Sequence, residues 1–206
     1  MQRVGITGAI GTGKSEVSRI LRQTGYPVIV ADDVARELTE TDPEIRRRLR
    51  ERFGDAYFDE DGHLRRRELA QLVFSDLSSL RELNQIVHPA MIQEIRRQLD
   101  ELEAEGHQRA FVEAAVLYEA RMAPLFDIVA VVACDLPMAM RRTARRLGIT
   151  EQEAWQRYRS QIPLEEKIRR ADYVIWNQGT LEELEEKVEE FLRWLDDPRH
   201  PRAWRD

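Results

Sequence analysis

The apolar residues of this chain fall into short runs separated by longer amphipathic stretches. Five such runs occur, none with clean alternation of apolar and polar residues: Arg3–Thr7, Pro27–Val30, Arg109–Ala115, Ile128–Ala133 and Asp172–Trp176. Runs of this kind are typical of strands that helices cover on both faces. Buried strands alternating with helices predict an α/β fold, with a five-stranded parallel sheet flanked by helices.

The stretches between the predicted strands have helical spacing. A helix is expected over Lys14–Gln23, and another from about Val34, where Asp32 and Asp33 are well placed to cap it. A last helix is expected from about Thr180 to Leu195, with one apolar face made of Leu181, Leu184, Val188, Leu192 and Leu195. The tail 196–206 contains two prolines and is expected to be poorly ordered.

The block between the second and third predicted strands is too long for a simple crossover. From Asp42 to Glu105 the pattern is mostly helical with arginine-rich faces, and Gly54–Gly62 is polar and predicted to be a loop. We therefore interpret 33–107 as a helical insertion on the substrate side of a single domain, because 206 residues suffice for one domain with a modest insertion.

A glycine-rich loop follows the first predicted strand. It matches the full P-loop pattern and consists of Gly8, Ala9, Ile10, Gly11, Thr12, Gly13, Lys14 and Ser15. Its glycines let backbone N–H groups turn toward an anion, and the following helix presents its positive end to the same place. In such loops the lysine bridges the β- and γ-phosphates of ATP, and the serine hydroxyl binds Mg²⁺. A chance glycine cluster is disfavoured, because the required strand and helix flank the loop.

Composition narrows the set of partners. The net charge of −6 provides no general attraction to nucleic acid or to a membrane, and we expect neither as a partner. No apolar run reaches the roughly 18 residues that span a bilayer, and the N-terminus leads directly into a strand without a signal-peptide pattern, so a cytoplasmic protein is expected. The single cysteine, Cys134, is predicted to be a small buried hydrophobic residue.

Nearly all basic residues of this chain are arginines. Of 32 basic residues, only Lys14, Lys167 and Lys187 are lysines. In a chain so biased toward arginine each lysine calls for a reason, and Lys14 has one, because a tight phosphate cradle favours a compact point charge.

Other sequence features favour a kinase over a GTPase or a motor ATPase. No lysine lies in an Asn-Lys-x-Asp element, and the run ending at Glu113 offers one carboxylate where a motor ATPase needs an Asp-Glu pair. Asp32 follows the second predicted strand, at the sheet edge where open α/β folds bind ligands. There it would accept a proton from an attacking hydroxyl or help to position Mg²⁺, although a helix-capping role for Asp32 or Asp33 stays open.

The segment Arg141–Arg157 is rich in arginine and has the pattern of a mobile lid, which we place at about 146–167. We expect arginines before and after a helix that starts at Gly148. Most of them are expected to be solvated, since exposed pairs contribute ~0–1 kcal/mol. One or two arginines above a transferring phosphoryl group would instead contribute about 10³–10⁵ in rate.

An ordered set of motifs extends over about Val4 to Leu195. It comprises Gly5–Ser15, Val28–Asp32 running into Ala35-Arg36, His88-Pro89, Leu117–Glu119, Arg157 with Ser160-Gln161, Glu166-Lys167, Ala171–Ile175 and Asn177-x-Gly179. Together these residues resemble the dephospho-CoA kinase family. The resemblance implies a P-loop kinase fold and transfer of phosphate from ATP, with Mg²⁺, to the ribose 3′-hydroxyl of dephospho-CoA.

The same resemblance implies roles for individual residues. Lys14 and Asp32 would be catalytic, with Asp32 as the proposed general base, and the lid would contribute Arg146 and Arg157. Arg36 and His88 would belong to the dephospho-CoA side, and Asn177 and Gly179 to the loop near the adenine of ATP. For His88 a helix-start position is the alternative, since Pro89 suits the first turn of a helix. A monomer is expected.

Three departures from the family pattern accompany the resemblance. Val30 replaces the first Asp of an Asp-Ala-Asp motif, Glu113 stands in place of an Asp without the proline that usually follows, and Glu16 replaces a common Thr. Two other hypotheses stay open. One is a kinase acting on another small acceptor, such as a nucleoside monophosphate. The other is a nucleotide-binding regulator that has lost catalysis.

Overall fold

The computed structural model describes residues 1–197, which form two compact units. The first consists of Met1–Val30 and the chain from Leu99 onward, and the second of Ala31–Gln98. Most of the predicted tail 196–206 lies outside the described residues, although Asp196 still belongs to the last helix.

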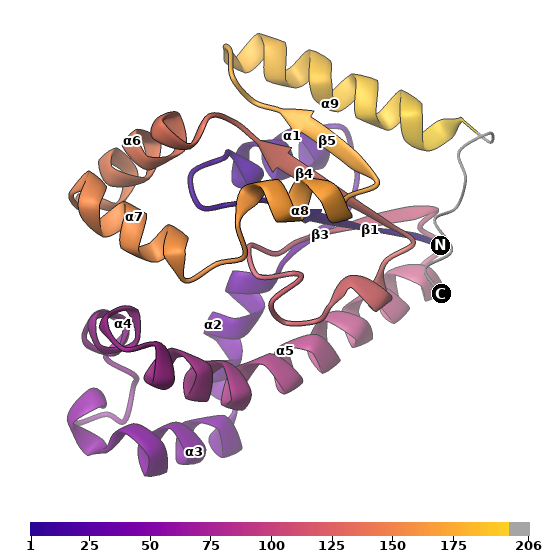
Figure 1. Cartoon of the computed structure of the whole chain (residues 1–206). Helices are drawn as coiled ribbons and strands as arrows, with labels where there is room; N and C mark the ends of the chain where they lie inside the picture. Colours follow the sequence, from indigo (N-terminus) through magenta and orange to yellow (C-terminus); the bar gives the residue numbers. More distant parts are fainter. Residues whose placement is uncertain (198–206) are drawn as a thin grey trace. The chain divides into compact units, whose positions relative to one another are not determined.

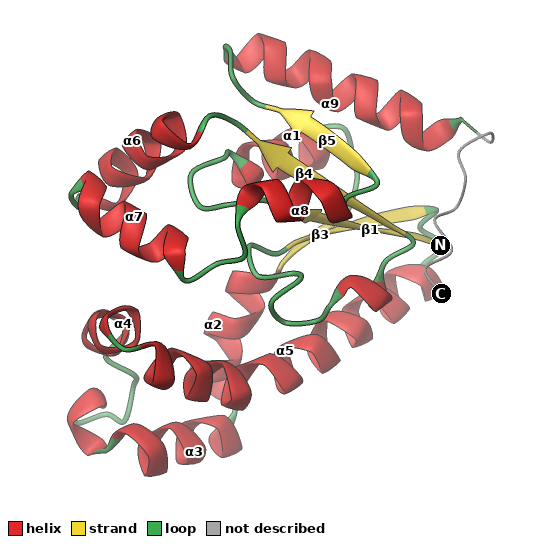
Figure 2. Cartoon of the chain, viewed as in Figure 1, coloured by secondary structure: helices red, strands yellow, loops and turns green. Residues whose placement is uncertain are grey.

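The first unit contains a sheet of five parallel strands in the order β2-β3-β1-β4-β5. The strands are β1 (Gln2–Thr7), β2 (Val28–Val30), β3 (Arg109–Glu113), β4 (Ile128–Ala133) and β5 (Tyr173–Trp176). Since all five are parallel, their carboxyl ends, and the loops that follow them, lie at one edge of the sheet (Figures 1 and 2). The predicted fold class is confirmed.

For two strands the predicted start lies one residue before the observed start: Pro27 precedes β2, and Asp172 precedes β5. Pro27 has no N–H for the ladder, and only its carbonyl pairs, with the N–H of Phe111 at 3.0 Å. Asp172 lies just before β5, where its N–H donates to the carbonyl of Val129 at 2.8 Å and its carboxylate accepts the N–H of Val129 at 2.8 Å. In addition, β3 ends at Glu113 and not at Ala115.

Helices α1 (Lys14–Gln23) and α9 (Leu181–Asp196) supply one side of the main core, which they share with β1, β3, β4 and β5. Phe191 is fully buried there, with its ring centroid 4.8 Å from that of Tyr173 and 6.5 Å from that of Phe111. The apolar face predicted for this helix is correct except at Leu181, which is 44% exposed. Phe191, which is not among the predicted residues, is buried on the same face. Cys134 is buried as predicted.

The remaining elements of the first unit follow β3 and β4. They are η2 (Ala123–Leu125), α6 (Leu136–Leu147), α7 (Glu151–Arg159) and α8 (Leu164–Arg170). The prediction that a helix starts at Gly148 is wrong. Gly148 ends α6 in the left-handed conformation, and α7 begins after Thr150, whose hydroxyl and Glu153 form a reciprocal capping box.

The second unit is helical and has its own core. Its elements are α2 (Ala31–Thr41), α3 (Pro43–Phe53), the short 3₁₀ turn η1 (Asp55–Tyr57), α4 (Arg66–Ser75) and most of α5 (Leu77–Ala104). Buried side chains from α3, η1's flank and α5 pack together, namely Ile45, Leu49, Phe58, Ile86 and Val87. The segment predicted as a loop, Gly54–Gly62, contains η1 and the start of a bridge between Phe58 and Leu64.

Two helix starts in this unit differ from expectation. Helix α2 begins at Ala31, so Asp32 and Asp33 lie inside its first turn and do not precede it as caps; carboxylates there still interact favourably with the helix dipole. His88 and Pro89 lie inside α5, so the alternative that His88 starts a helix is wrong. Among residues 1–197, none of the helices has the length and apolar character needed to cross a bilayer.

We predict that Phe191→Ala lowers the free energy of unfolding by about 3–5 kcal/mol, because it leaves a cavity among the rings of Tyr173 and Phe111. Leu181→Ala, in the same helix, is the matched control and should change it by no more than about 0.5 kcal/mol, since that side chain is solvated. Urea unfolding followed by circular dichroism measures both. Equal losses in the two variants would contradict this description of the core.

Candidate functional site

The phosphate loop joins β1 to α1 and is closed by its own side chains. The ammonium group of Lys14 donates hydrogen bonds to the carbonyls of Gly8, at 3.2 Å, and Ala9, at 3.0 Å. The hydroxyl of Thr12 donates to the same Ala9 carbonyl at 2.9 Å. Lys14 is buried, whereas Ser15 is exposed in the first turn of α1. The positive charge is therefore held against the loop.

Protein backbone lies so close to the loop that its glycines cannot carry side chains. A Cβ at Gly8 would collide with the carbonyl of Val132 in β4, and one at Gly11 with the carbonyl of Ala139 in α6. Gly11 and Gly13 also have φ angles of +80° and +97°, which favour glycine. The loop thus rests on β4 and α6 and follows the path that the glycines allow.

These groups fit a polyphosphate and its metal ion. Gly13 precedes the first residue of α1, so the loop ends at the positive end of that helix, next to the Lys14 ammonium. The exposed hydroxyl of Ser15 in the first helical turn is an oxygen ligand of the kind that Mg²⁺ takes in P-loop proteins.

The segment after β5 supports the loop from the side. The buried side-chain amide of Asn177 donates to the carbonyl of Thr12 at 2.9 Å, across 165 residues of sequence. Arg142 of α6 in turn donates to the backbone carbonyl of Asn177 at 3.1 Å. At Gly179 a Cβ would collide with the carboxylate of Glu183, which reaches back to cap α9 at Thr180. Asn177 therefore has a clear scaffold role, whereas Gly179 lies against the exposed end of the Glu183 side chain.

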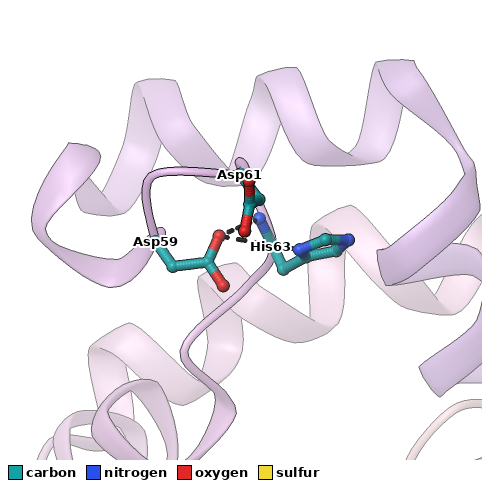
Figure 3. A group of neighbouring side chains, drawn as sticks. All are labelled: Asp59, Asp61 and His63. Carbon is teal, nitrogen blue, oxygen red and sulfur yellow. Dashed lines mark hydrogen bonds and ion pairs between the residues drawn. The ribbon is translucent and has the colours of Figure 1, made fainter.

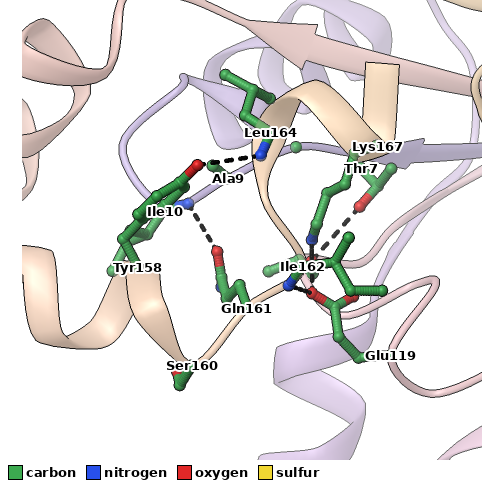
Figure 4. Close-up of polar contacts among 12 residues, drawn as sticks. Thr7, Ala9, Ile10, Glu119, Tyr158, Ser160, Gln161, Ile162, Leu164 and Lys167 are labelled. Atoms are coloured by element: carbon green, nitrogen blue, oxygen red, sulfur yellow. Dashed lines mark hydrogen bonds and ion pairs between the residues drawn. The ribbon is translucent and has the colours of Figure 1, made fainter. Parts of the chain in front are cut away.

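The two predicted lid arginines lie on different helices. Arg146 is exposed in the last turn of α6, and Arg157 is half-buried on α7. Four residues beyond Arg157, the side chain of Gln161 points at the phosphate loop and accepts the N–H of Ile10 at 3.1 Å (Figure 4). The motif Ser160-Gln161 was visible in the sequence, but nothing in its spacing indicated this contact.

A buried ion pair lies near the end of β3. The Lys167 ammonium, on α8, is 2.9 Å from a carboxylate oxygen of Glu119 and donates to the carbonyl of Ala115 at 2.6 Å. The same Glu119 oxygen accepts the N–H of Ile162 at 2.8 Å (Figure 4). Burial lowers the pKa of Lys167, and the negative charge of Glu119 opposes this effect. Both residues belong to motifs of the sequence, Leu117–Glu119 and Glu166-Lys167, but those motifs gave no sign that the two side chains meet.

The predicted acceptor-side residues belong to the second unit. Asp32 and Arg36 are exposed and one turn apart on α2, where the guanidinium of Arg36 lies 2.5 Å from the carboxylate of Asp33. His88 is half-buried in the middle of α5. In the first unit, Lys14, Asn177 and Arg142 thus lie around the phosphate loop. In the second unit, Asp32 and Arg36 lie on one helix.

Asp59, Asp61 and His63 bring ligand atoms within 4.8 Å of one another on an exposed loop of the second unit (Figure 3). The carboxylate of Asp59 already accepts the backbone N–H of His63 at 2.7 Å, and the chain turns back there into the bridge between Phe58 and Leu64. We therefore assign this group to the turn.

Comparison with known proteins gives consistent matches over nearly the whole chain. The sequence profile described as dephospho-CoA kinase matches residues 2–183. A dephospho-CoA kinase of Bacillus cereus is 40% identical over 190 residues, which are 92% of this chain and 95% of that protein. A crystal structure of a Thermus thermophilus protein is 36% identical with a TM-score of 0.77, covering 95% of this chain and 98% of that one. A dephospho-CoA kinase from Campylobacter jejuni, 24% identical, has the same fold, with a TM-score of 0.69 and coverage of 95% and 98%.

We predict that Gly11→Ala abolishes measurable ATP binding, because its Cβ would push the loop off Ala139 and Thr143. Gly25→Ala is the matched control: it has a similar φ of +89°, but nothing lies within 4 Å of its Cβ. Both variants bear the left-handed strain of about 1–2 kcal/mol, so only steric displacement of the loop distinguishes them. Equilibrium binding of a fluorescent ATP analogue measures the effect. Equal affinities in the two variants would refute it.

Proposed function

The chain belongs to the dephospho-CoA kinase family and is an ATP-dependent dephospho-CoA kinase, and we propose that it works through the phosphate loop, Asp32 and the lid arginines. The reaction is transfer of the γ-phosphoryl group of ATP to the ribose 3′-hydroxyl of dephospho-CoA. The observation that carries this assignment of roles is the closed loop Gly8–Ser15, with the buried ammonium of Lys14 held against it.

On the ATP side, we assign phosphate binding to residues 8–15. When phosphates enter, Lys14 exchanges two backbone carbonyls for charged oxygens, which are stronger hydrogen-bond acceptors for an ammonium group. Ser15 would hold Mg²⁺, which neutralises charge on the phosphate oxygens. Asn177 and Gly179 would border the adenine, a role supported by the contact of Asn177 with the loop.

On the acceptor side, Asp32 would accept the proton of the ribose hydroxyl. Its exposure in the first turn of α2, two residues beyond the end of β2, supports this role. Arg36 and His88 would bind the anionic groups of dephospho-CoA. The Arg36–Asp33 pair is exposed at both partners and is therefore weak, so Arg36 can exchange Asp33 for a substrate phosphate at little cost.

Arg146 and Arg157 would stabilise charge that develops on the transferring phosphoryl group.

The structure bears on two of the departures from the family pattern, Glu16 and Glu113. The Glu16 carboxylate accepts a hydrogen bond from Arg19 at 2.6 Å along the surface of α1. Glu113 ends β3 opposite Ile6 of β1, which keeps a carboxylate at the ligand-binding edge. We propose a monomer that works in the cytoplasm, where its substrates would be found.

An acceptor panel tests the substrate assignment. The enzyme is incubated with ATP, Mg²⁺ and either dephospho-CoA, AMP, a nucleoside or pantetheine, and ADP formation is followed with a coupled assay. We expect dephospho-CoA to be preferred by orders of magnitude in kcat/KM. Preference for another acceptor would favour the alternative kinase, and ATP binding without ADP formation in any mixture would favour the regulator.

We predict that Lys14→Ala and Asp32→Asn each reduce kcat by at least about 100-fold, since each removes a group that acts in the transition state. Two matched controls remove an exposed charge of the same sign: Lys187→Ala on α9 and Glu37→Gln on α2. These should leave kcat within about twofold, because surface charges contribute little. Circular dichroism verifies folding. Near-native turnover in Asp32→Asn would exclude Asp32 as the base.

A further inference from the structure

The connector between α7 and α8, residues 160–163, is held by hydrogen bonds from two other parts of the chain. The side chain of Gln161 accepts the N–H of Ile10 in the phosphate loop, at 3.1 Å. The N–H of Ile162 donates to Glu119 at 2.8 Å, in the turn after β3. Figure 4 shows the two contacts on successive residues, with the Lys167 ammonium beyond Glu119. The connector therefore bridges the phosphate loop and the turn after β3.

Lys167 ties this arrangement together. Its side chain is fully buried, its ammonium bridges the Glu119 carboxylate and the Ala115 carbonyl, and the Thr7 hydroxyl lies 3.5 Å from the same carbonyl. Thr7 is the last residue of β1, directly before the phosphate loop. Lys167 thus joins α8 to the turn after β3, and the Ala115 carbonyl that it binds also accepts the hydroxyl of Thr7 in the strand that leads into the loop.

A buried ion pair is a costly way to join segments. Desolvating two charges offsets most of their attraction, and apolar residues of similar volume often stabilise a fold equally well. What such a pair provides, and an apolar contact does not, is a fixed direction and distance. Retention of this lysine in a chain with 32 basic residues, only three of them lysines, is consistent with a requirement for a compact ammonium at this point.

We propose that Lys167 and Glu119 are a positioning pair that sets the placement of the lid connector, and through it of Gln161 and Arg157, relative to the phosphate loop. Arg157 lies on α7 near its end at Arg159, and its carbonyl accepts the N–H and the hydroxyl of Ser160, the first residue of the connector. A shift of the connector therefore displaces both Gln161 and Arg157. Neither member of the pair touches the reacting atoms in this proposal. It rests on the kinase function proposed above and adds residues to which that proposal gives no role.

The test uses the full chain and five variants: Lys167→Met, Glu119→Gln, the double variant, Gln161→Ala and the double Lys167→Met/Gln161→Ala. Lys187→Met is the matched control, since Lys187 is an exposed lysine paired with Glu190 on α9. Measurements are kcat and KM for ATP and for dephospho-CoA, and the melting temperature Tm.

We expect Lys167→Met to lower kcat by about 10–100-fold, because small displacements of positioned groups cause losses of this size. The KM for dephospho-CoA should stay nearly unchanged. The control Lys187→Met should have the kcat of the unmodified enzyme. Glu119→Gln should have the lowest Tm, because it leaves a buried ammonium without its counter-charge. The charge-free Lys167→Met/Glu119→Gln variant should recover Tm but not kcat, which separates positioning from stability. Gln161→Ala should add little to the loss in Lys167→Met, since both act through one connector.

Two results would overturn the proposal. One is recovery of kcat together with Tm in the Lys167→Met/Glu119→Gln variant, which would mean that the pair only maintains the fold. The other is multiplicative losses for Lys167→Met and Gln161→Ala, which would mean that they act independently. An unmodified enzyme that does not phosphorylate dephospho-CoA would instead refute the proposed function, so the two failures are distinguishable.

Discussion

The phosphate loop depends on one constraint: its backbone packs against β4, α6 and Asn177 with no room for side chains at Gly8, Gly11 or Gly13. The parallel sheet makes this possible, because it ends β1, β4 and β5 at the same edge. Since β4 and β5 follow β1 by more than a hundred residues, the loop has its shape only when the whole first unit is folded. A binding site for phosphates is in this sense a property of the sheet, which positions the partners that the loop needs.

Lysine and arginine side chains lie mainly in different environments, lysine in the interior and arginine on the surface. Two lysines are buried, and each has its charge bound by named groups: Lys14 by loop carbonyls and Lys167 by Glu119 and Ala115. The third, Lys187, lies on the surface with Glu190. Most arginines within residues 1–197 are exposed, and several of them pair with a carboxylate on the same helix, as Arg47 does with Glu44 and Arg97 with Glu94. Such pairs contribute little to stability. The two buried cations are thus compact ammonium groups, whereas the larger guanidinium groups of residues 1–197 lie mainly on the surface.

The residues with proposed roles belong to both compact units. The first holds the phosphate loop, its supports and helices α6 and α7, which carry the proposed lid arginines, whereas Asp32, Arg36 and His88 belong to the second, helical unit with its own core. The chain passes from the first unit to the second at Val30 and Ala31, where β2 runs directly into α2. Asp32 lies in the first turn after that junction. The end of β2 therefore places Asp32 at the start of α2.

The sequence by itself determined the features that depend on neighbouring residues. Apolar runs located all five strands to within a residue or two, and the spacing of Gly8, Gly13, Lys14 and Ser15 located the loop, because strand burial and loop shape leave local patterns. Only the tertiary structure decided the rest. In the structure α2 starts at Ala31 and not near Val34, Gly148 ends a helix and does not start one, and His88 lies within α5. The tertiary structure also brought Gln161 to Ile10 and Asn177 to Thr12 across 151 and 165 residues. Contacts between such distant residues leave no periodic signal, since they arise from the order of strands in the sheet and from where each connecting segment must run.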